Sequence, residues 1–186
     1  MIFFHIPLDF HKRSRHIISI LRGIDMNYKA LWGNPFKKTS SDLESEISFL
    51  ASVPVFDSLS KRQIRKIHSI MHVRNFEKGE IVFRKGDPGV GLYIIRDGAV
   101  DLYNEFPDLT RMKITDLSTG NFFGEISLLN DSPRSATVVA TSSSVLLGLF
   151  RHDLLELMNS DPVLGVKLVY RLSQIVAERL RLVNET

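Results

Sequence analysis

The stretch KGEIVFRKGDPGVGLYIIRDGAVDLY, residues 78–103, decides the fold. It contains three short runs that are rich in β-branched and aromatic residues, and turn-forming residues separate the runs. The runs are Glu80–Arg84, Leu92–Ile95 and Ala99–Tyr103, and the breaks between them are Gly86-Asp87-Pro88-Gly89 and Asp97-Gly98. This alternation predicts short strands that are joined by tight turns.

The same pattern continues toward the C-terminus, where further strands are predicted at 110–116, 134–140 and 144–150. Seven of the eleven glycines lie between positions 79 and 124, and turns use glycine because it tolerates positive φ. Many short strands at this spacing predict a mainly β domain, built as a barrel or jelly roll.

Helical spacing returns on both sides of the predicted strands. Leu43, Ile47 and Leu50 recur at helical spacing, Pro54 interrupts them, and Ser60 is predicted to begin a second helix. After the strands, helices are predicted at Arg151–Met158 and Asp161–Asn184. The second of these carries one apolar stripe, which either folds back onto the barrel or forms a dimer seam: Leu164, Leu168, Leu172, Ile175 and Leu182.

Composition limits the class of protein. The 186 residues are 44% hydrophobic and 24% charged, which fits one globular domain with an extra arm. The chain has no cysteine, so disulfides, cysteine-ligated zinc, iron–sulfur clusters and a catalytic thiol are excluded. The longest run without a charged residue, Ser135–Phe150, has 16 residues and falls short of a membrane span, and Met1–Leu8 lacks the features of a signal peptide. A cytoplasmic protein is therefore expected.

The charges divide the chain into two parts. Residues 1–41 hold 7 Lys and Arg against 2 acidic residues, whereas residues 42–186 hold 17 against 19. We therefore expect a basic N-terminal arm, with a helix at Leu8–Arg22, followed by the main domain. Because the main domain is slightly acidic, it carries no broad footprint for a phosphate backbone, and no DNA partner is expected.

The segment FFGEISLLNDSPRSAT, residues 122–137, has the residues of an anion site. Gly124 permits close backbone approach, Glu125–Leu129 can form one helical turn, and the Arg134 guanidinium suits bidentate phosphate binding. Glu125 accepts hydrogen bonds and would repel a second anion. The ligand that fits these residues combines a phosphate with a hydroxyl-bearing group, as a nucleotide or a sugar phosphate does.

This segment resembles the phosphate-binding cassette of the cyclic nucleotide-binding domain family, of the type found in the catabolite activator protein and in regulatory subunits of cAMP-dependent kinase. The likeness continues at residues 78–89, 92–98 and 120–124, and it covers roughly residues 45–184. The resemblance implies an eight-stranded jelly-roll barrel that short helices precede and two C-terminal helices follow.

The resemblance also implies roles for individual residues. Glu125 would bind the ribose 2′-hydroxyl and Arg134 the cyclic phosphate, while Ser135, beside the arginine, leaves the choice between cAMP and cGMP open. The full set of candidate ligand-binding residues is Phe123, Gly124, Glu125, Ile126, Ser127, Arg134, Ser135 and Ala136 in the cassette, Val82, Val100 and Leu102 for an apolar base slot, and Arg181, Val183 and Asn184 for a lid.

Enzyme and metal motifs are missing from the sequence. It contains no GxSxG elbow, no phosphate-binding GxxxxGK[ST] loop and no complete Rossmann fingerprint. His68 and His72 have the spacing of a helical metal pair, but without an HExxH motif they are interpreted as packed or surface residues. No catalysis, metal or cofactor is expected.

The function predicted from these features is a non-catalytic sensor of cAMP or cGMP, in which ligand binding moves the C-terminal helices and a partner surface. The arm of residues 1–41 or the flanking helices would contact a separate protein, membrane contact is not expected, and a homodimer is left open. A transcription regulator would need a helix-turn-helix after the last helix, which these residues do not supply. The remaining alternative is a ligand-free scaffold or peripheral interaction protein.

Overall fold

The computed structural model describes residues 40–106 and 110–185. The helix predicted at Leu8–Arg22 lies outside the described residues, as does almost all of the basic arm.

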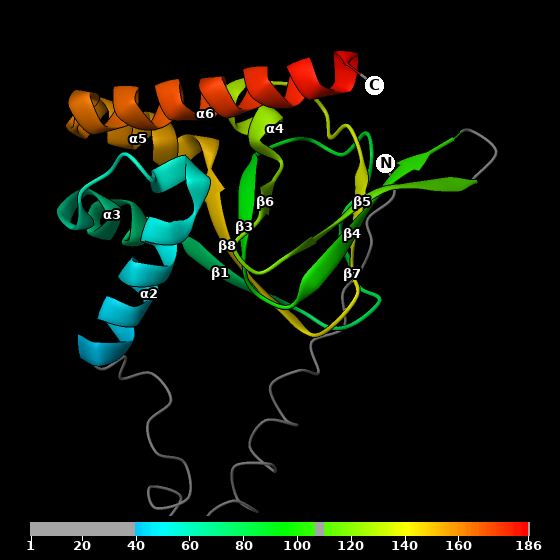
Figure 1. The fold of residues 1–186 in the computed structure, drawn as a ribbon, viewed down its shortest axis with the longest axis horizontal. Coiled ribbons are helices and arrows are strands. Elements are labelled where there is room, and N and C mark those ends of the chain that lie inside the picture. The colour runs from blue at the N-terminus through cyan, green and yellow to red at the C-terminus, as the bar shows by residue number, and fades with distance from the viewer. Residues whose placement is uncertain (1–39, 107–109, 186) are drawn as a thin grey trace, which may run out of the picture. The chain divides into compact units, whose positions relative to one another are not determined.

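The described residues form two four-stranded antiparallel sheets, and helices flank them (Figure 1). The first sheet has the order β1-β8-β3-β6, and the second has the order β2-β7-β4-β5. The strands are β1 His72–Phe76, β2 Ile81–Phe83, β3 Gly91–Asp97, β4 Ala99–Glu105, β5 Arg111–Ser118, β6 Phe122–Phe123, β7 Thr137–Ala140 and β8 Ser144–Phe150. The predicted mainly β architecture with helices before and after it is confirmed.

Three details differ from the predicted strands. β1 was not predicted, because four of its five residues are exposed and it shows no alternation of apolar and polar positions. β6 has only two residues, too few for any periodic pattern. The strand predicted at 134–140 begins only at Thr137, so Arg134 lies in the loop that precedes β7.

Two apolar clusters hold this domain together. A smaller one, inside the barrel, is formed by Ile95, Val100, Phe123, Val138 and Leu146. A larger one joins the first sheet to the helices, and the central strands β3 and β8 contribute Leu92, Ile94, Leu147 and Leu149 to it. The helices are therefore anchored on the outer face of one sheet by buried apolar side chains.

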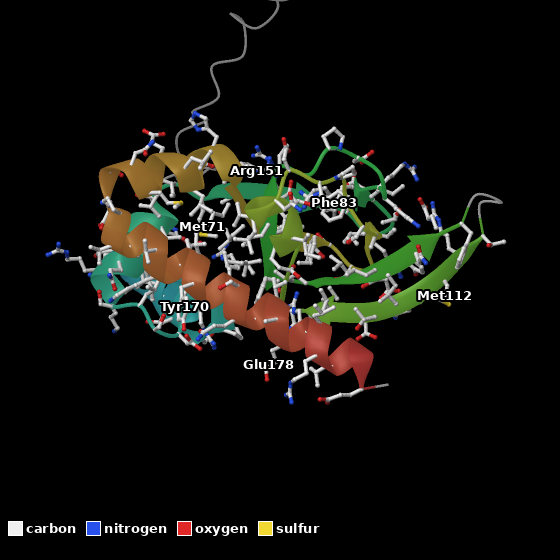
Figure 2. All side chains as sticks on the ribbon, turned by 90° about the horizontal axis from the view of Figure 1, so that it is seen from above. Met71, Phe83, Met112, Arg151, Tyr170 and Glu178 are labelled. Carbon is white, nitrogen blue, oxygen red and sulfur yellow. The ribbon has the colours of Figure 1, made fainter. Side chains whose placement is uncertain are left out.

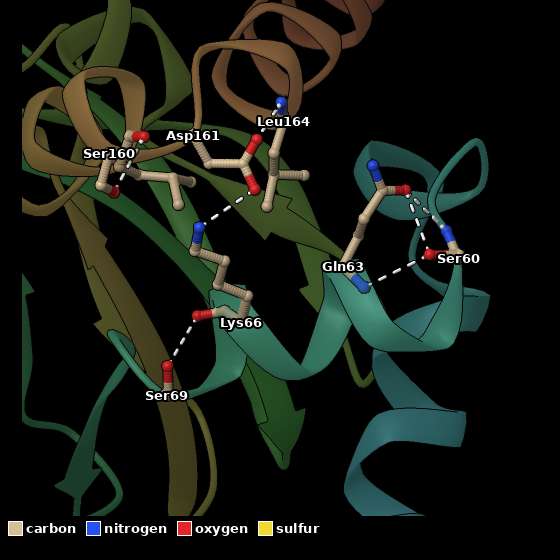
Figure 3. Close-up of polar contacts among 8 residues, drawn as sticks. Ser60, Gln63, Lys66, Ser69, Ser160, Asp161 and Leu164 are labelled. Carbon is tan, nitrogen blue, oxygen red and sulfur yellow. Dashed lines mark hydrogen bonds and ion pairs between the residues drawn. The ribbon is translucent and has the colours of Figure 1, made fainter.

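The helices on the N-terminal side are α2 (Ser40–Ser52), the 3-10 helix η2 (Pro54–Phe56) and α3 (Lys61–His68). Ser60 caps α3, as predicted: its Oγ accepts a hydrogen bond from the Gln63 N–H, and the Gln63 side chain accepts one from the Ser60 N–H (Figure 3). This reciprocal box satisfies two backbone donors that the start of a helix leaves free.

The helices on the C-terminal side are α5 (Arg151–Ser160) and α6 (Pro162–Asn184), and α6 passes over α4 (Glu125–Leu129) (Figure 1). Asp161 caps α6, because its side chain accepts a hydrogen bond from the Leu164 N–H at 3.2 Å (Figure 3). The same carboxylate also accepts a hydrogen bond from Lys66 Nζ at 3.0 Å. The hydrogen bond from Lys66 contributes most to holding the pKa of Asp161 below its ordinary value.

The apolar stripe of α6 packs against its own domain over the first half of the helix. Leu164, Leu168 and Leu172 are fully buried in the larger cluster, whereas Leu182 is exposed. The opposite face of α6 leaves Val163, Val166 and Tyr170 mostly exposed; Figure 2 labels Tyr170. No helix among the described residues has the length and apolar character that a membrane span requires.

Candidate ligand-binding pocket

A cavity of about 400 Å³ lies between α4, the second sheet and the C-terminal half of α6. Five segments far apart in the sequence line it: β2, the β4–β5 pair, the segment from Phe123 to Ser127, β7 with the loop before it, and α6. The lining residues are Phe83, Leu102, Ile114, Thr115, Leu117, Phe123, Gly124, Glu125, Ile126, Ser127, Arg134, Ser135, Ala136, Val138, Arg179 and Leu182.

Arg134 supplies a buried positive charge to this cavity. Arg134 is only 4% exposed. Its guanidinium lies 4.0 Å from the centre of the Phe83 ring, and its Nη1 donates to the Gly91 carbonyl at 2.6 Å. Nε has no hydrogen-bond partner, and no described carboxylate forms an ion pair with Arg134. Burial lowers the pKa of Arg134 from its ordinary value. A buried cation without a counterion is costly, so the cavity is built to receive an anion.

Glu125 begins α4 and is 7% exposed. Its Oε1 lies 2.9 Å from Nη1 of Arg179 on α6. Arg179 also lies over the Phe122 ring, 4.6 Å from its centre, and donates from Nη2 to the Phe122 carbonyl at 3.3 Å. A carboxylate has about four lone-pair sites, so Glu125 retains acceptor capacity for ligand hydroxyl groups while it is paired with Arg179.

Gly124 joins these two charged groups. Its φ of +80° is in the left-handed region, which favours glycine, and a Cβ there would lie 2.5 Å from Nη1 of Arg134 and 3.0 Å from the Gly91 carbonyl oxygen. No side chain larger than hydrogen fits between the cassette backbone and the guanidinium. The close approach of a ligand to the backbone at this glycine stays a prediction.

The remainder of the lining is mostly apolar. Leu102, Leu117 and Ile114 come from the β4–β5 pair, and Leu182 comes from α6. Ile114 and Leu182 each leave about half of their surface exposed. Among the described residues that line the cavity, those with a hydroxyl group are Ser127, Ser135 and Thr115. A weakly polar part of a ligand suits this side of the cavity.

The structure brings most of the predicted site residues together. Nine of them line the cavity: Leu102, Phe123, Gly124, Glu125, Ile126, Ser127, Arg134, Ser135 and Ala136.

Three predicted residues do not line the cavity. Val82 is replaced by its neighbour Phe83, because the β2–β7 register shifts between Ile81 and Phe83 and breaks the simple alternation of faces. Val100 is fully buried in the inner cluster. Arg181 is exposed and pairs with Glu185 at 3.4 Å. The side chains of Val183 and Asn184 lie outside what the structure describes.

The sequence prediction missed Arg179, which lies on the cavity side of α6. The signal was present, since Ile175, Arg179 and Leu182 are four and three residues apart and therefore share one helical face. The other residues that were missed are Phe83, Ile114, Thr115, Leu117, Val138 and Leu182.

The two histidines with helical spacing contact different carboxylates. His68 Nε2 lies 2.7 Å from Glu46 Oε2, and His72 Nε2 lies 3.2 Å from Asp153 Oδ2. Each histidine is therefore bound to its own structural partner, which agrees with the interpretation of packed or surface residues.

The sequence and the fold resemble known proteins. The profile of the cyclic nucleotide-binding domain matches residues 73–161. A cGMP-dependent protein kinase of Plasmodium berghei is 34% identical over 81% of this chain and 17% of its own length. The cyclic AMP receptor protein of Thermus thermophilus is 33% identical over 69% of this chain and 57% of its own length.

Solved structures agree with these sequence matches. A cyclic nucleotide-binding domain from Methylobacillus flagellatus superposes with a TM-score of 0.66 and is 28% identical, covering 76% of this chain and 79% of that one. The chain thus spans most of an isolated domain, but less than two thirds of the length of either relative named above.

Proposed function

Because the chain belongs to the cyclic nucleotide-binding domain family, we propose that it is a non-catalytic regulatory protein that binds cAMP or cGMP in the cavity beside α4. Binding would change the position of α5 and α6 and thereby alter a surface that a partner protein recognises. The cassette residues Gly124 to Ser127 and Arg134 to Ala136 would hold the phosphate and ribose, and the apolar lining would hold the base.

The observation that carries this proposal is the buried guanidinium of Arg134, which forms no ion pair with any described carboxylate. A cyclic phosphate bears one negative charge and two free oxygens, so it would provide Arg134 with the counterion that the described residues do not. Glu125 would accept a hydrogen bond from the ribose 2′-hydroxyl, and Arg179 would offset the repulsion between this carboxylate and the phosphate. The site therefore distinguishes the two ends of one ligand.

The arrangement favours binding over catalysis. A general base needs a pKa near the working pH and a proton within reach in the bound ligand. Glu125 instead pairs with Arg179, so one of its oxygens already serves as an acceptor in a fixed contact with α6.

The choice between cAMP and cGMP is left to experiment. One relative is named for cGMP and another for cyclic AMP, at 34% and 33% identity. Ser135 and Thr115 both bring a hydroxyl group to the cavity, and either can donate to or accept from a purine edge.

The output of the protein would pass through α6, which contributes both Arg179 and Leu182 to the lining. A ligand shifts the helix position only if it binds one position more tightly than the other, and contacts with these two residues would supply that difference. We further propose that the basic arm or the exposed surface of the flanking helices contacts a separate partner protein.

Isothermal titration calorimetry with cAMP, cGMP and 5′-AMP tests the proposal. We expect one-site binding of at least one cyclic nucleotide, much weaker binding of 5′-AMP, and no nucleotide hydrolysis in the recovered sample. A ligand at about 100 times Kd should also stabilise the fold by about 2.7 kcal/mol, which a thermal melt detects. If neither cyclic nucleotide gives heat or a melting shift at millimolar concentration, the protein is a ligand-free scaffold.

A further inference from the structure

Arg151 is a second arginine that holds the cassette, although it does not line the cavity. It is the first residue of α5, directly after β8, and Figure 2 labels it. Its side chain is 25% exposed. The site described above makes no use of it.

The guanidinium of Arg151 gathers backbone carbonyls from two other segments. Nη2 donates to the carbonyl oxygens of Ser127, of Asn130 at 2.7 Å and of Gly89 at 3.1 Å. Nη1 pairs with Asp131 at 2.5 Å. Ser127 is the middle residue of α4, and Asn130 is the residue that follows this helix. Gly89 belongs to the loop before β3.

Two of these carbonyls belong to α4 and to the residue that follows it. The last carbonyl groups of a helix have no partner within the helix, and a cation placed there satisfies them and interacts favourably with the local dipole. α4 has only five residues, so its own hydrogen bonds are too few to keep it in place. The hydrogen bonds from Arg151 therefore hold α4 in place from outside the helix.

Arg151 also contributes charge to the site. Its positive charge is one of the causes that lower the pKa of Arg134, after the effect of burial. The field of Arg151 thus reaches the guanidinium that would bind the phosphate, and it adds to the attraction of the cavity for an anion.

We propose that Arg151 is a positioning residue of the binding site, which locks the cassette backbone in its binding-competent conformation and joins it to the first turn of α5. The inference rests on the proposed function for its effect on ligand affinity. The mechanical part concerns the ligand-free protein alone. Through this arginine, a movement of the cassette would pull directly on α5.

Arg151→Ala tests the proposal, and Arg171→Ala is a matched control. Arg171 is also a partly exposed arginine, at 29%, that donates to a carbonyl, of Pro54 at 3.2 Å, and pairs with a carboxylate, of Asp57. It lies on α6 and does not line the cavity. The control therefore reproduces the loss of a similar set of contacts elsewhere in the domain.

Two measurements separate the outcomes. In the ligand-free protein, we expect Arg151→Ala to raise amide hydrogen exchange selectively within residues 124–136, and Arg171→Ala to leave that segment unchanged. In calorimetry with the cyclic nucleotide that the wild type binds, we expect Arg151→Ala to weaken affinity about tenfold or more, and Arg171→Ala to stay within about twofold. Arg151→Lys keeps the charge but not the fork of donors, so we expect it to restore part of both losses.

Unchanged exchange in the cassette of Arg151→Ala overturns the proposal, as does an equal affinity loss in Arg171→Ala. If Arg151→Ala does not fold, Arg151→Lys decides: exchange and affinity both equal to those of the wild type overturn the inference, and a loss confined to the cassette supports it. If the wild type binds neither nucleotide, the proposed function fails, while the exchange measurement still tests the positioning role.

Discussion

Arg179 on α6 and Glu125 at the start of α4 form an ion pair with 2.9 Å between Nη1 and Oε1, and both residues line the same cavity. This pair joins the element that would hold the ligand to the helix that would report on it. Arg179 is almost half exposed, so water can solvate its charge without Glu125. Glu125 is buried and depends more on the pair for a counterion. The charge of Glu125 is balanced before any anion enters.

Removing Arg179 should weaken cyclic nucleotide binding. In Arg179→Ala the buried Glu125 faces the ligand phosphate without its counterion, so we expect a loss of about tenfold, a value discounted for the exposure of the arginine. In the Glu125→Gln background, residue 125 carries no charge, so the same change should lower the affinity less than about threefold. Calorimetry on the four proteins of this cycle measures the coupling. Equal losses in both backgrounds would show that Arg179 acts independently of Glu125.

Replacing Arg134 should abolish most of the affinity for a cyclic phosphate. Truncating one side of a desolvated charge pair costs about 2–5 kcal/mol, or roughly 30-fold to several-thousand-fold in Kd. Arg134→Ala should do this while the barrel stays folded, because the strands that surround Arg134 are held by the inner apolar cluster.

Circular dichroism and calorimetry check this prediction, with Arg134→Lys as the companion variant. The lysine keeps the charge but loses the bidentate geometry and the donation to Gly91, so an intermediate affinity is expected. Wild-type binding by Arg134→Ala would place the ligand elsewhere.

The sequence predicted those parts of the site that depend on local chain geometry. Gly124, Glu125 and Arg134 lie within eleven residues of one another, and the structure brings them to one cavity. The turns between strands were equally local, since glycine and aspartate break the strands at fixed places.

The errors concern features that local patterns do not contain. Val82 was predicted as one of the barrel positions for the base slot, but the pairing of β2 with β7 is irregular and its neighbour Phe83 lines the cavity instead. Arg181 was predicted from the resemblance, as part of the segment where a lid would arise, but the face of α6 that meets the cavity depends on how Leu164, Leu168 and Leu172 pack. This face is fixed by the tertiary core rather than by the helix itself.

Removing residues 1–39 tests the proposal for the arm. The deletion leaves α2 complete, because that helix begins at Ser40. We expect nucleotide affinity to stay within about threefold, or about 0.65 kcal/mol, since the cavity lining starts at Phe83. Recovery of the partner protein in a pull-down should be lost. A large drop in affinity would make the arm part of the binding domain, and unchanged recovery would exclude it as the contact.

Gly124→Ala should damage binding more than its backbone strain alone explains. A residue other than glycine in the left-handed region costs about 1–2 kcal/mol of folding free energy. At Gly124 the new methyl group would also meet Nη1 of Arg134 at 2.5 Å and push the guanidinium away from the ligand.

Gly120→Ala provides the matched control for this last variant. Gly120 has a similar φ of +87°, but nothing lies within 4 Å of its Cβ position. Gly120→Ala therefore introduces the same backbone strain without displacing a neighbouring atom. We expect both variants to lower the melting temperature, and only Gly124→Ala to weaken cyclic nucleotide binding, by about tenfold or more. Thermal melts and calorimetry on the two proteins measure both effects. Equal affinities would mean that Arg134 does not need its present position against the Gly124 backbone to hold the ligand.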